Sequence, residues 1–132
     1  MPDIERTNPE GLAPPPGGRY SHVVRWGNLV WIAGQTSRGP DGKVIGLDSA
    51  PAQCRQVYEN LRTAIESVGG TFANIVKVTI FVTSEAYLPA ARAAQNECWG
   101  DAPTPASSMV IVRALAQPEY LIEIEAFAVL DD

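Results

Sequence analysis

The chain has 132 residues, of which 45% are hydrophobic and 19% are charged, and its formal net charge is −5 at pH 7. This length and composition suit one globular domain, and the acidic balance argues against a nucleic-acid partner, because phosphate backbones attract basic surfaces. No apolar run approaches the roughly 20 residues of a membrane helix and no signal-peptide pattern opens the chain, so we expect a cytoplasmic protein without a membrane partner.

The first 18 residues differ in composition from the rest of the chain. They are rich in proline and glycine and show no apolar period, which predicts a flexible N-terminal arm over residues 1–18. We therefore expect a single folded domain over residues 19–132. Its first two strands are predicted at residues 21–24 and 29–33, where β-branched runs flank the turn sequence Trp26-Gly27-Asn28.

The remaining elements alternate between helix and strand. Apolar residues recur at three- and four-residue spacing between Asp48 and Val68, which predicts a helix that ends at Gly69-Gly70. A β-branched run at residues 75–82 predicts a strand, and an alanine-rich segment at 85–99 predicts a second helix. Two further strands are expected at residues 106–112 and 120–129. The order ββαβαββ indicates an α+β fold with a mixed sheet and two helices on one face.

The last strand predicts self-association. Alternate residues point to opposite faces of a sheet, and the set Ile122, Ile124, Ala126 and Ala128 forms an apolar face that two helices can cover. The strand at 75–82 alternates likewise, with Val76 on its covered side. The other face is mixed and includes phenylalanines as well as carboxylates. Two helices cover only one face, so we expect other copies of the chain to cover the second.

Several motifs, taken in order, resemble the reactive-intermediate deaminase family, also called RidA/YjgF or RutC-like. The resemblance is carried by the runs Arg19-Tyr20-Ser21-His22, Ile32-Ala33-Gly34-Gln35, Asn60-Leu61, Ile75 to Val82, Pro105 to Val110 and Ile122 to Val129. It implies a chorismate-mutase-like fold, a homotrimer around a central barrel, and clefts between subunits. It also implies hydrolysis of reactive enamines or imines to a carbonyl compound and ammonia, with no metal and no cofactor.

The same resemblance implies the residues of the cleft. Glu123 takes the position of the catalytic carboxylate, which would exchange protons with a water placed against the imine carbon. Tyr20, Gln35 and Ser107 take positions in or beside the substrate-binding site. His22, the one histidine of the sequence, has no nucleophile motif near it, and we interpret it as structural.

The chain departs from the family pattern at one important position. Active members carry an arginine directly after the Pro-Ala pair, where its guanidinium binds the substrate carboxylate, whereas this chain has Ser107. Two arginines could supply this charge from elsewhere: Arg92, on the second predicted helix, and Arg113. The sequence therefore predicts an imine deaminase-like hydrolase with an altered substrate. The alternative is a non-catalytic small-molecule-binding or interaction protein on the same trimeric scaffold.

Overall fold

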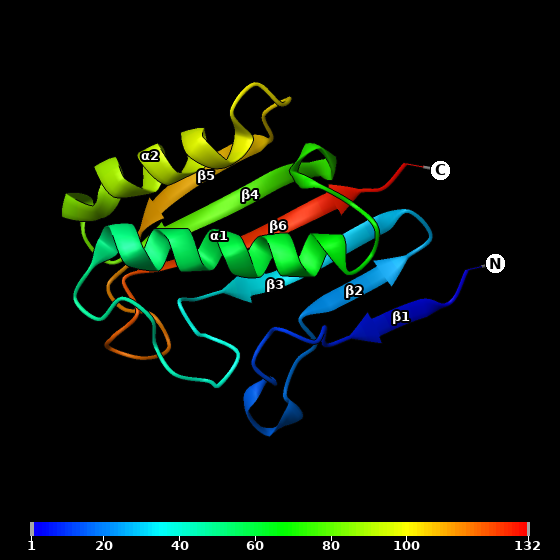
Figure 1. Ribbon diagram of the computed structural model, residues 1–132, viewed down its shortest axis with the longest axis horizontal. Helices are drawn as coiled ribbons and strands as arrows, with labels where there is room; N and C mark the ends of the chain where they lie inside the picture. The colour runs from blue at the N-terminus through cyan, green and yellow to red at the C-terminus, as the bar shows by residue number, and fades with distance from the viewer. Residues whose placement is uncertain (1, 132) are drawn as a thin grey trace.

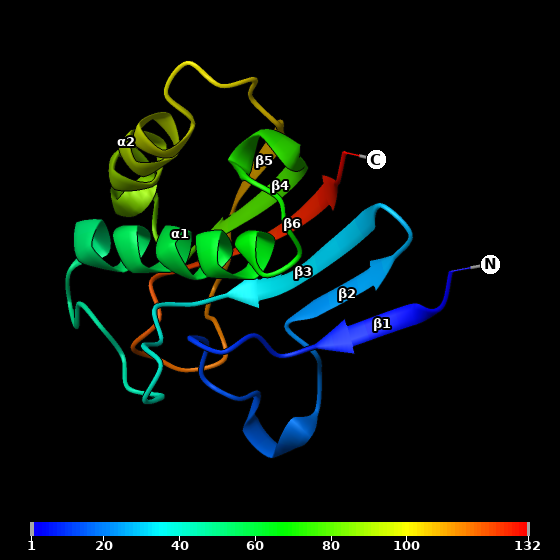
Figure 2. The ribbon, with the colours of Figure 1, turned by 45° about the vertical axis from the view of Figure 1, so that its right-hand side comes forward.

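The structure, a computed structural model, describes residues 2–131. Six strands form one sheet in the order β1-β2-β3-β6-β4-β5, and two helices lie together on one of its faces (Figures 1 and 2). The strands are β1 (Ile4–Thr7), β2 (Val23–Trp26), β3 (Leu29–Gln35), β4 (Ile75–Val82), β5 (Ala106–Ile111) and β6 (Ile122–Val129). The helices are α1 (Ala50–Glu66) and α2 (Leu88–Trp99), with short 3-10 turns at Pro16–Gly18, Phe72–Asn74 and Glu85–Tyr87.

The sheet is mixed. Strands β4 and β5 are parallel, and every other neighbouring pair is antiparallel. Parallel neighbours need a crossover connection, and α2 supplies it. The predicted α+β architecture with both helices on one face is confirmed. No helix in the described part of the chain is long and apolar enough to cross a membrane.

Local sequence signals explain where the first helix and the hairpin lie. The side chain of Ser49 accepts a hydrogen bond from the backbone N–H of Ala52, so it caps α1 at its N-terminus. Strands β2 and β3 join through Gly27 and Asn28, and Gly27 has a φ of +59°, which glycine adopts without steric cost.

The core lies between the helices and one face of the sheet. The apolar residues of β6 that alternation assigned to this face are all buried, and Ile124 and Ala128 are fully inaccessible. They pack with Leu61 and Ile65 of α1 in one hydrophobic cluster. The predicted assignment of the two faces of β6 is therefore confirmed.

The assignment is wrong at the start of β4. We expected Val76 on the covered face, but Val76 is 42% exposed and Ile75 is buried instead. The cause is a register shift: Ile75 pairs with Ala128, whereas Lys77 pairs with Phe127, so β4 holds one extra residue. Such a β-bulge reverses the phase of alternation, and an uninterrupted apolar run gives no sign of it.

The expected start of the folded domain near Arg19 is also wrong. Strand β1 pairs with β2, and Leu12 and Ala13 are buried. The backbone N–H of His22 donates to Asn8 Oδ1 at 2.9 Å, and its ring Nε2 lies 2.7 Å from the carbonyl oxygen of Ala13. The segment before Arg19 therefore packs on the domain through a short edge strand, single buried side chains and these bonds.

Candidate functional site

A pocket of about 390 Å³ opens where β3 ends and β6 begins. Three connecting segments gather at this end of the sheet: residues 8–22, residues 36–49 and residues 112–121 (Figure 1). The pocket is lined by Pro16, Arg19, Tyr20, Ala33, Gly34, Thr36, Arg38, Ala116, Gln117, Tyr120 and Glu123. Its volume lies within the roughly 300–1,000 Å³ of typical small-molecule sites.

Glu123 reaches this pocket because β3 carries a bulge and a glycine opposite it. The register shifts between Ile32 and Gln35, which places one extra residue in β3 next to Gly34. A Cβ atom built at Gly34 would lie 2.8 Å from Cδ of Glu123 and closer still to its Oε2, so only glycine leaves room for this carboxylate. Among residues 2–131, the carboxylate has no hydrogen-bond partner.

The environment of Glu123 changes its acidity. Partial burial raises the pKa of Glu123, and the neighbouring charge of Glu125 raises it further. Desolvation and a like charge both favour the neutral form of a carboxyl group. A carboxyl group whose pKa moves toward neutral pH is better suited to accept and return a proton during a reaction.

Two other predicted site residues lie beside Glu123 in different ways. Tyr20 is 43% exposed and lines the pocket, with its ring edge-on to His22 at 5.6 Å between centroids. Gln35 is buried, and its Nε2 lies 3.1 Å from Nδ1 of His22 and donates to the carbonyl oxygen of Ala33 at 3.1 Å. Gln35 thus supports the pocket from behind, and the buried, hydrogen-bonded His22 has the structural role that we expected.

Ser107 and Arg92 lie elsewhere in the chain. Ser107 pairs with the buried Val78, so its side chain shares the helix-covered face, and its Oγ accepts a hydrogen bond from Gln95 Nε2 of α2 at 3.1 Å. Arg92 is exposed on α2, about one turn before Gln95. Glu123 lies on the opposite, helix-free face, so one chain alone does not bring these predicted site residues together.

A second cavity lies near Ser107. It measures about 360 Å³ and lies where α2 meets the loop that leads into β5. Its lining includes Gln95, the same side chain that binds Ser107, together with Trp99 and Pro105. The concave surface that contains Glu123 is therefore separate from the one near Ser107.

Sequence reasoning missed two arginines of the Glu123 pocket. Arg19 and Arg38 both line it, whereas Arg113, proposed as a source of charge, does not. The available signal was proximity in sequence, because Arg19 precedes Tyr20 and Arg38 follows Gln35 by three residues. Whether such side chains turn into the same pocket depends on the loops that carry them, which the sequence pattern does not specify.

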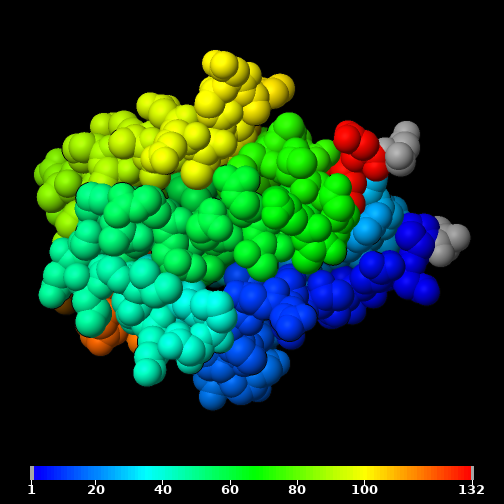
Figure 3. Space-filling model, viewed as in Figure 1, coloured from blue at the N-terminus to red at the C-terminus, as the bar shows by residue number. Residues whose placement is uncertain are grey.

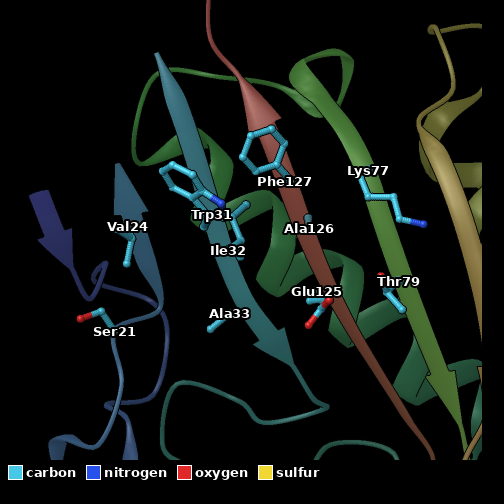
Figure 4. A pocket seen from close by; sticks show the side chains of 10 residues that line it. All are labelled: Ser21, Val24, Trp31, Ile32, Ala33, Lys77, Thr79, Glu125, Ala126 and Phe127. Atoms are coloured by element: carbon cyan, nitrogen blue, oxygen red, sulfur yellow. The ribbon is translucent and has the colours of Figure 1, made fainter. Parts of the chain in front are cut away.

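The helix-free face of the sheet carries a large apolar surface. Trp31 is 43% exposed and packs edge-to-face against Phe127 at 5.2 Å between centroids. Figure 4 shows both rings on this face, with Glu125 on the same strand as Phe127, Lys77 and Thr79 on the neighbouring β4, and the helices behind the sheet. Among the described residues, no three His, Cys, Asp or Glu side chains cluster closely enough to hold a metal ion.

Known proteins resemble the chain over nearly its whole length. A family model described as Endoribonuclease L-PSP matches residues 10–130. A RutC family protein of Pyrococcus horikoshii is 34% identical over 116 residues, covering 88% of this chain and 90% of that relative. The 2-iminobutanoate/2-iminopropanoate deaminase of Dermatophagoides farinae is 30% identical over 120 residues, covering 91% of this chain and 92% of that relative. The crystal structure of the YjgF gene product of E. coli matches with a TM-score of 0.86 at 30% identity, covering 95% of this chain and 98% of that chain.

Proposed function

Since this chain belongs to the Endoribonuclease L-PSP family, together with RutC family proteins, we propose that it hydrolyses a reactive imine or enamine and releases ammonia. The observation that carries this proposal is the Glu123 carboxylate, which is partly buried, without a hydrogen-bond partner among residues 2–131, and directed into an open pocket over Gly34. A similar protein from Dermatophagoides farinae is named as a deaminase of this kind.

The proposed reaction needs one water molecule and one group that exchanges protons. Water adds to the carbon of the protonated imine while the Glu123 carboxylate takes one proton from the water, and the resulting neutral carbinolamine carries hydroxyl and amino groups on one carbon. Glu123 then returns this proton to the amino nitrogen, the carbon–nitrogen bond breaks as the hydroxyl proton passes to the Glu123 carboxylate, and a carbonyl compound and ammonia leave. The raised pKa of Glu123 makes its carboxylate a better acceptor for the proton of the water.

The other pocket residues would bind and orient the substrate. The exposed ring and hydroxyl of Tyr20 lie at the edge of the pocket. Gln35 acts indirectly, because its amide binds His22 and Ala33 and so stabilises the backbone on which Glu123 packs. Removing Tyr20 should therefore weaken substrate binding, whereas removing Gln35 should disturb the shape of the pocket.

We further propose that the working form is a homotrimer around a central barrel, with a cleft between adjacent subunits. Exposed apolar side chains on the helix-free face, Trp31 among them, favour burial against other copies of the chain. The opposite orientations of Glu123 and Ser107 also favour this arrangement, because two chains can place these residues in one cleft and a single chain does not. Arg92 would enter the cleft from the same neighbour as Ser107.

Ser107 indicates an altered substrate. Its hydroxyl accepts a hydrogen bond from Gln95 and carries no charge, so it does not replace the family arginine as a partner for a carboxylate. This observation also favours the second candidate function, a small-molecule-binding protein that retains the scaffold without turnover. A binder would be stabilised against thermal unfolding by a metabolite that it leaves unchanged.

Ammonia release from a panel of imines generated in situ, with and without a carboxylate, tests the proposed reaction. We expect the wild-type protein to accelerate release for part of the panel and Glu123→Gln to lower the rate by about 100- to 10,000-fold. Glu66→Gln is the control, since Glu66 is an exposed carboxylate on α1 that lies outside this pocket. Equal rates with and without the wild-type protein would refute the proposal, as would full activity in Glu123→Gln.

A further inference from the structure

Two arginines share the pocket of Glu123 without a carboxylate partner. Arg19 and Arg38 both line this pocket, and within residues 2–131 the one ion pair joins Arg62 to Glu59. The whole chain has 10 basic and 15 acidic residues, so carboxylates are in excess. Two guanidinium groups that remain unpaired beside one cavity in such a chain point to an anion as their partner.

Arg38 is held in place by hydrogen bonds to its side chain and to its backbone. Its Nη2 donates to the carbonyl oxygen of Pro14 at 2.8 Å. The buried side chain of Asn60, on α1, donates to the carbonyl oxygens of Arg38 at 2.9 Å and Thr36 at 3.0 Å, which anchors the backbone on either side. A guanidinium has five N–H donors, so the bond to Pro14 leaves most of them for a ligand.

Arg19 reaches the pocket from the 3-10 turn at Pro16–Gly18. Gly17 in this turn has a φ of +64°, and a Cβ built there would lie 3.5 Å from Nε of Arg19, so the arginine side chain folds back over the turn. Its guanidinium has no hydrogen-bond partner among residues 2–131. Figure 3 shows the segment that contains Arg19, in blue, against the cyan loop after β3 that contains Arg38.

We propose that Arg19 and Arg38 form an anion subsite that binds the carboxylate of a small 2-imino or 2-oxo acid in the Glu123 pocket. The inference rests on the proposed function for the orientation of the ligand, whose reacting carbon would face Glu123. Ser107, near the other concave surface, carries no positive charge. The subsite supplies that charge instead, and it belongs to the same chain and the same pocket as Glu123. It makes Arg19 and Arg38 determinants of specificity for anionic ligands.

Binding of 2-oxobutanoate tests the subsite without requiring turnover. Isothermal titration of the full-length protein would compare this acid with 2-butanone, which keeps the carbonyl group and lacks the carboxylate. We expect saturable binding of 2-oxobutanoate that weakens about tenfold or more in Arg19→Gln and in Arg38→Gln, since hydrogen bonds to charged groups are among the stronger ones. Arg55→Gln, at an exposed arginine of α1 outside the pocket, should bind like wild type.

Circular dichroism and thermal unfolding would establish that each variant is folded. If Arg38→Gln does not fold because it loses the bond to Pro14, Arg19→Gln still tests the subsite. Equal binding of 2-oxobutanoate and 2-butanone, no binding of the acid by wild type, or unchanged binding in both pocket variants would overturn the subsite. Arginine-dependent binding without ammonia release from any imine would support the subsite and refute the proposed hydrolysis, so the two failures are distinguishable.

Discussion

The carboxylate of Glu123 occupies the space that a side chain at position 34 would fill, so Gly34 and Glu123 form one structural unit across β3 and β6. Gly34 does not have a positive φ, so its absence of a side chain, and not an unusual backbone conformation, is what the site requires. The bulge next to Gly34 adds one residue to β3 relative to β6 at this point.

Gly34→Ala should therefore displace the Glu123 side chain. Overpacking of a rigid core destabilises proteins by about 1–3 kcal/mol, but the atoms displaced here end a flexible side chain, so we expect a loss near the lower end of that range together with loss of ammonia release. Denaturant unfolding of a double-mutant cycle with Glu123→Ala checks the cause. In the Glu123→Ala background, Gly34→Ala should lower the free energy of unfolding much less than in wild type. An equal decrease in both backgrounds would show that a contact other than the one with Glu123 is responsible.

The stability of the protein should depend on pH through Glu123. Burial, reinforced by Glu125, raises the folded-state pKa of Glu123 above the ordinary value of 4.5, so the folded state holds this proton to higher pH than the unfolded state does. Stability therefore falls as the pH rises from about 4.5 through the folded-state pKa. Glu123→Gln should lack this fall, and urea unfolding at several pH values would reveal it. Glu66→Gln, at an exposed carboxylate on α1, should keep the wild-type dependence.

His22→Ala should loosen the segment before Arg19. The mutation removes the ring that contacts the carbonyl oxygen of Ala13 and the amide of Gln35, and buried groups left unpaired cost about 1–3 kcal/mol each. Hydrogen exchange over residues 8–18 should become faster than in wild type. Unchanged exchange there would mean that strand β1 and the burial of Leu12 hold the segment without His22.

Ser107→Arg should produce or increase activity on 2-aminoacrylate. The new guanidinium would occupy the position of the family arginine, and a bidentate bond to a carboxylate improves both binding and orientation. Ser108→Arg is the matched control, because Ser108 lies on the other face of β5, where its Oγ accepts a hydrogen bond from Lys77 Nζ at 2.8 Å. A steady-state assay with freshly generated 2-aminoacrylate would compare them, and equal rates in the two variants would contradict the prediction.

Trp31→Glu should shift the protein toward monomer. The ring of Trp31 packs on Phe127 in the exposed apolar face, and a charge there would oppose its burial between copies. Light scattering and sedimentation at micromolar concentration would measure the mass of wild type and variant. Leu47→Glu removes a similarly exposed apolar side chain from the loop before α1 and should leave the mass unchanged. A monomeric wild type would disprove the proposed trimer.

The sequence predicted best where one physical rule governs a whole element. Strand β6 lies in the middle of the sheet, so strict alternation decides the burial of Ile122 and Ile124, and the face that they share was assigned correctly. The start of β4 was assigned incorrectly because the bulge at Val76 depends on its partner strand. The extent of the domain was underestimated because Leu12 and Ala13 are isolated apolar residues within a proline-rich stretch.

The candidate site was predictable only in part for a similar reason. Motifs identified Glu123 and Tyr20, which share a pocket, but did not show that Ser107 faces away from them. Gln35 was expected in or beside the substrate-binding site, and its buried amide binds His22 and Ala33. Loop residues such as Arg38 enter the pocket because segments distant in sequence pack together. The spacing of residues in a single sequence does not predict such packing.

Strand pairing also determines how the protein can be handled in the laboratory. Ile4 pairs with Trp26 and Val129 pairs with Leu29, so both ends of the described chain lie beside the hairpin turn, at the end of the sheet remote from Gly34 and its pocket (Figure 1). An affinity tag, a fluorophore or a surface linker attached at either end would sit far from the ligand entrance. Immobilised protein should therefore remain open to small molecules, which makes surface-based screening practical.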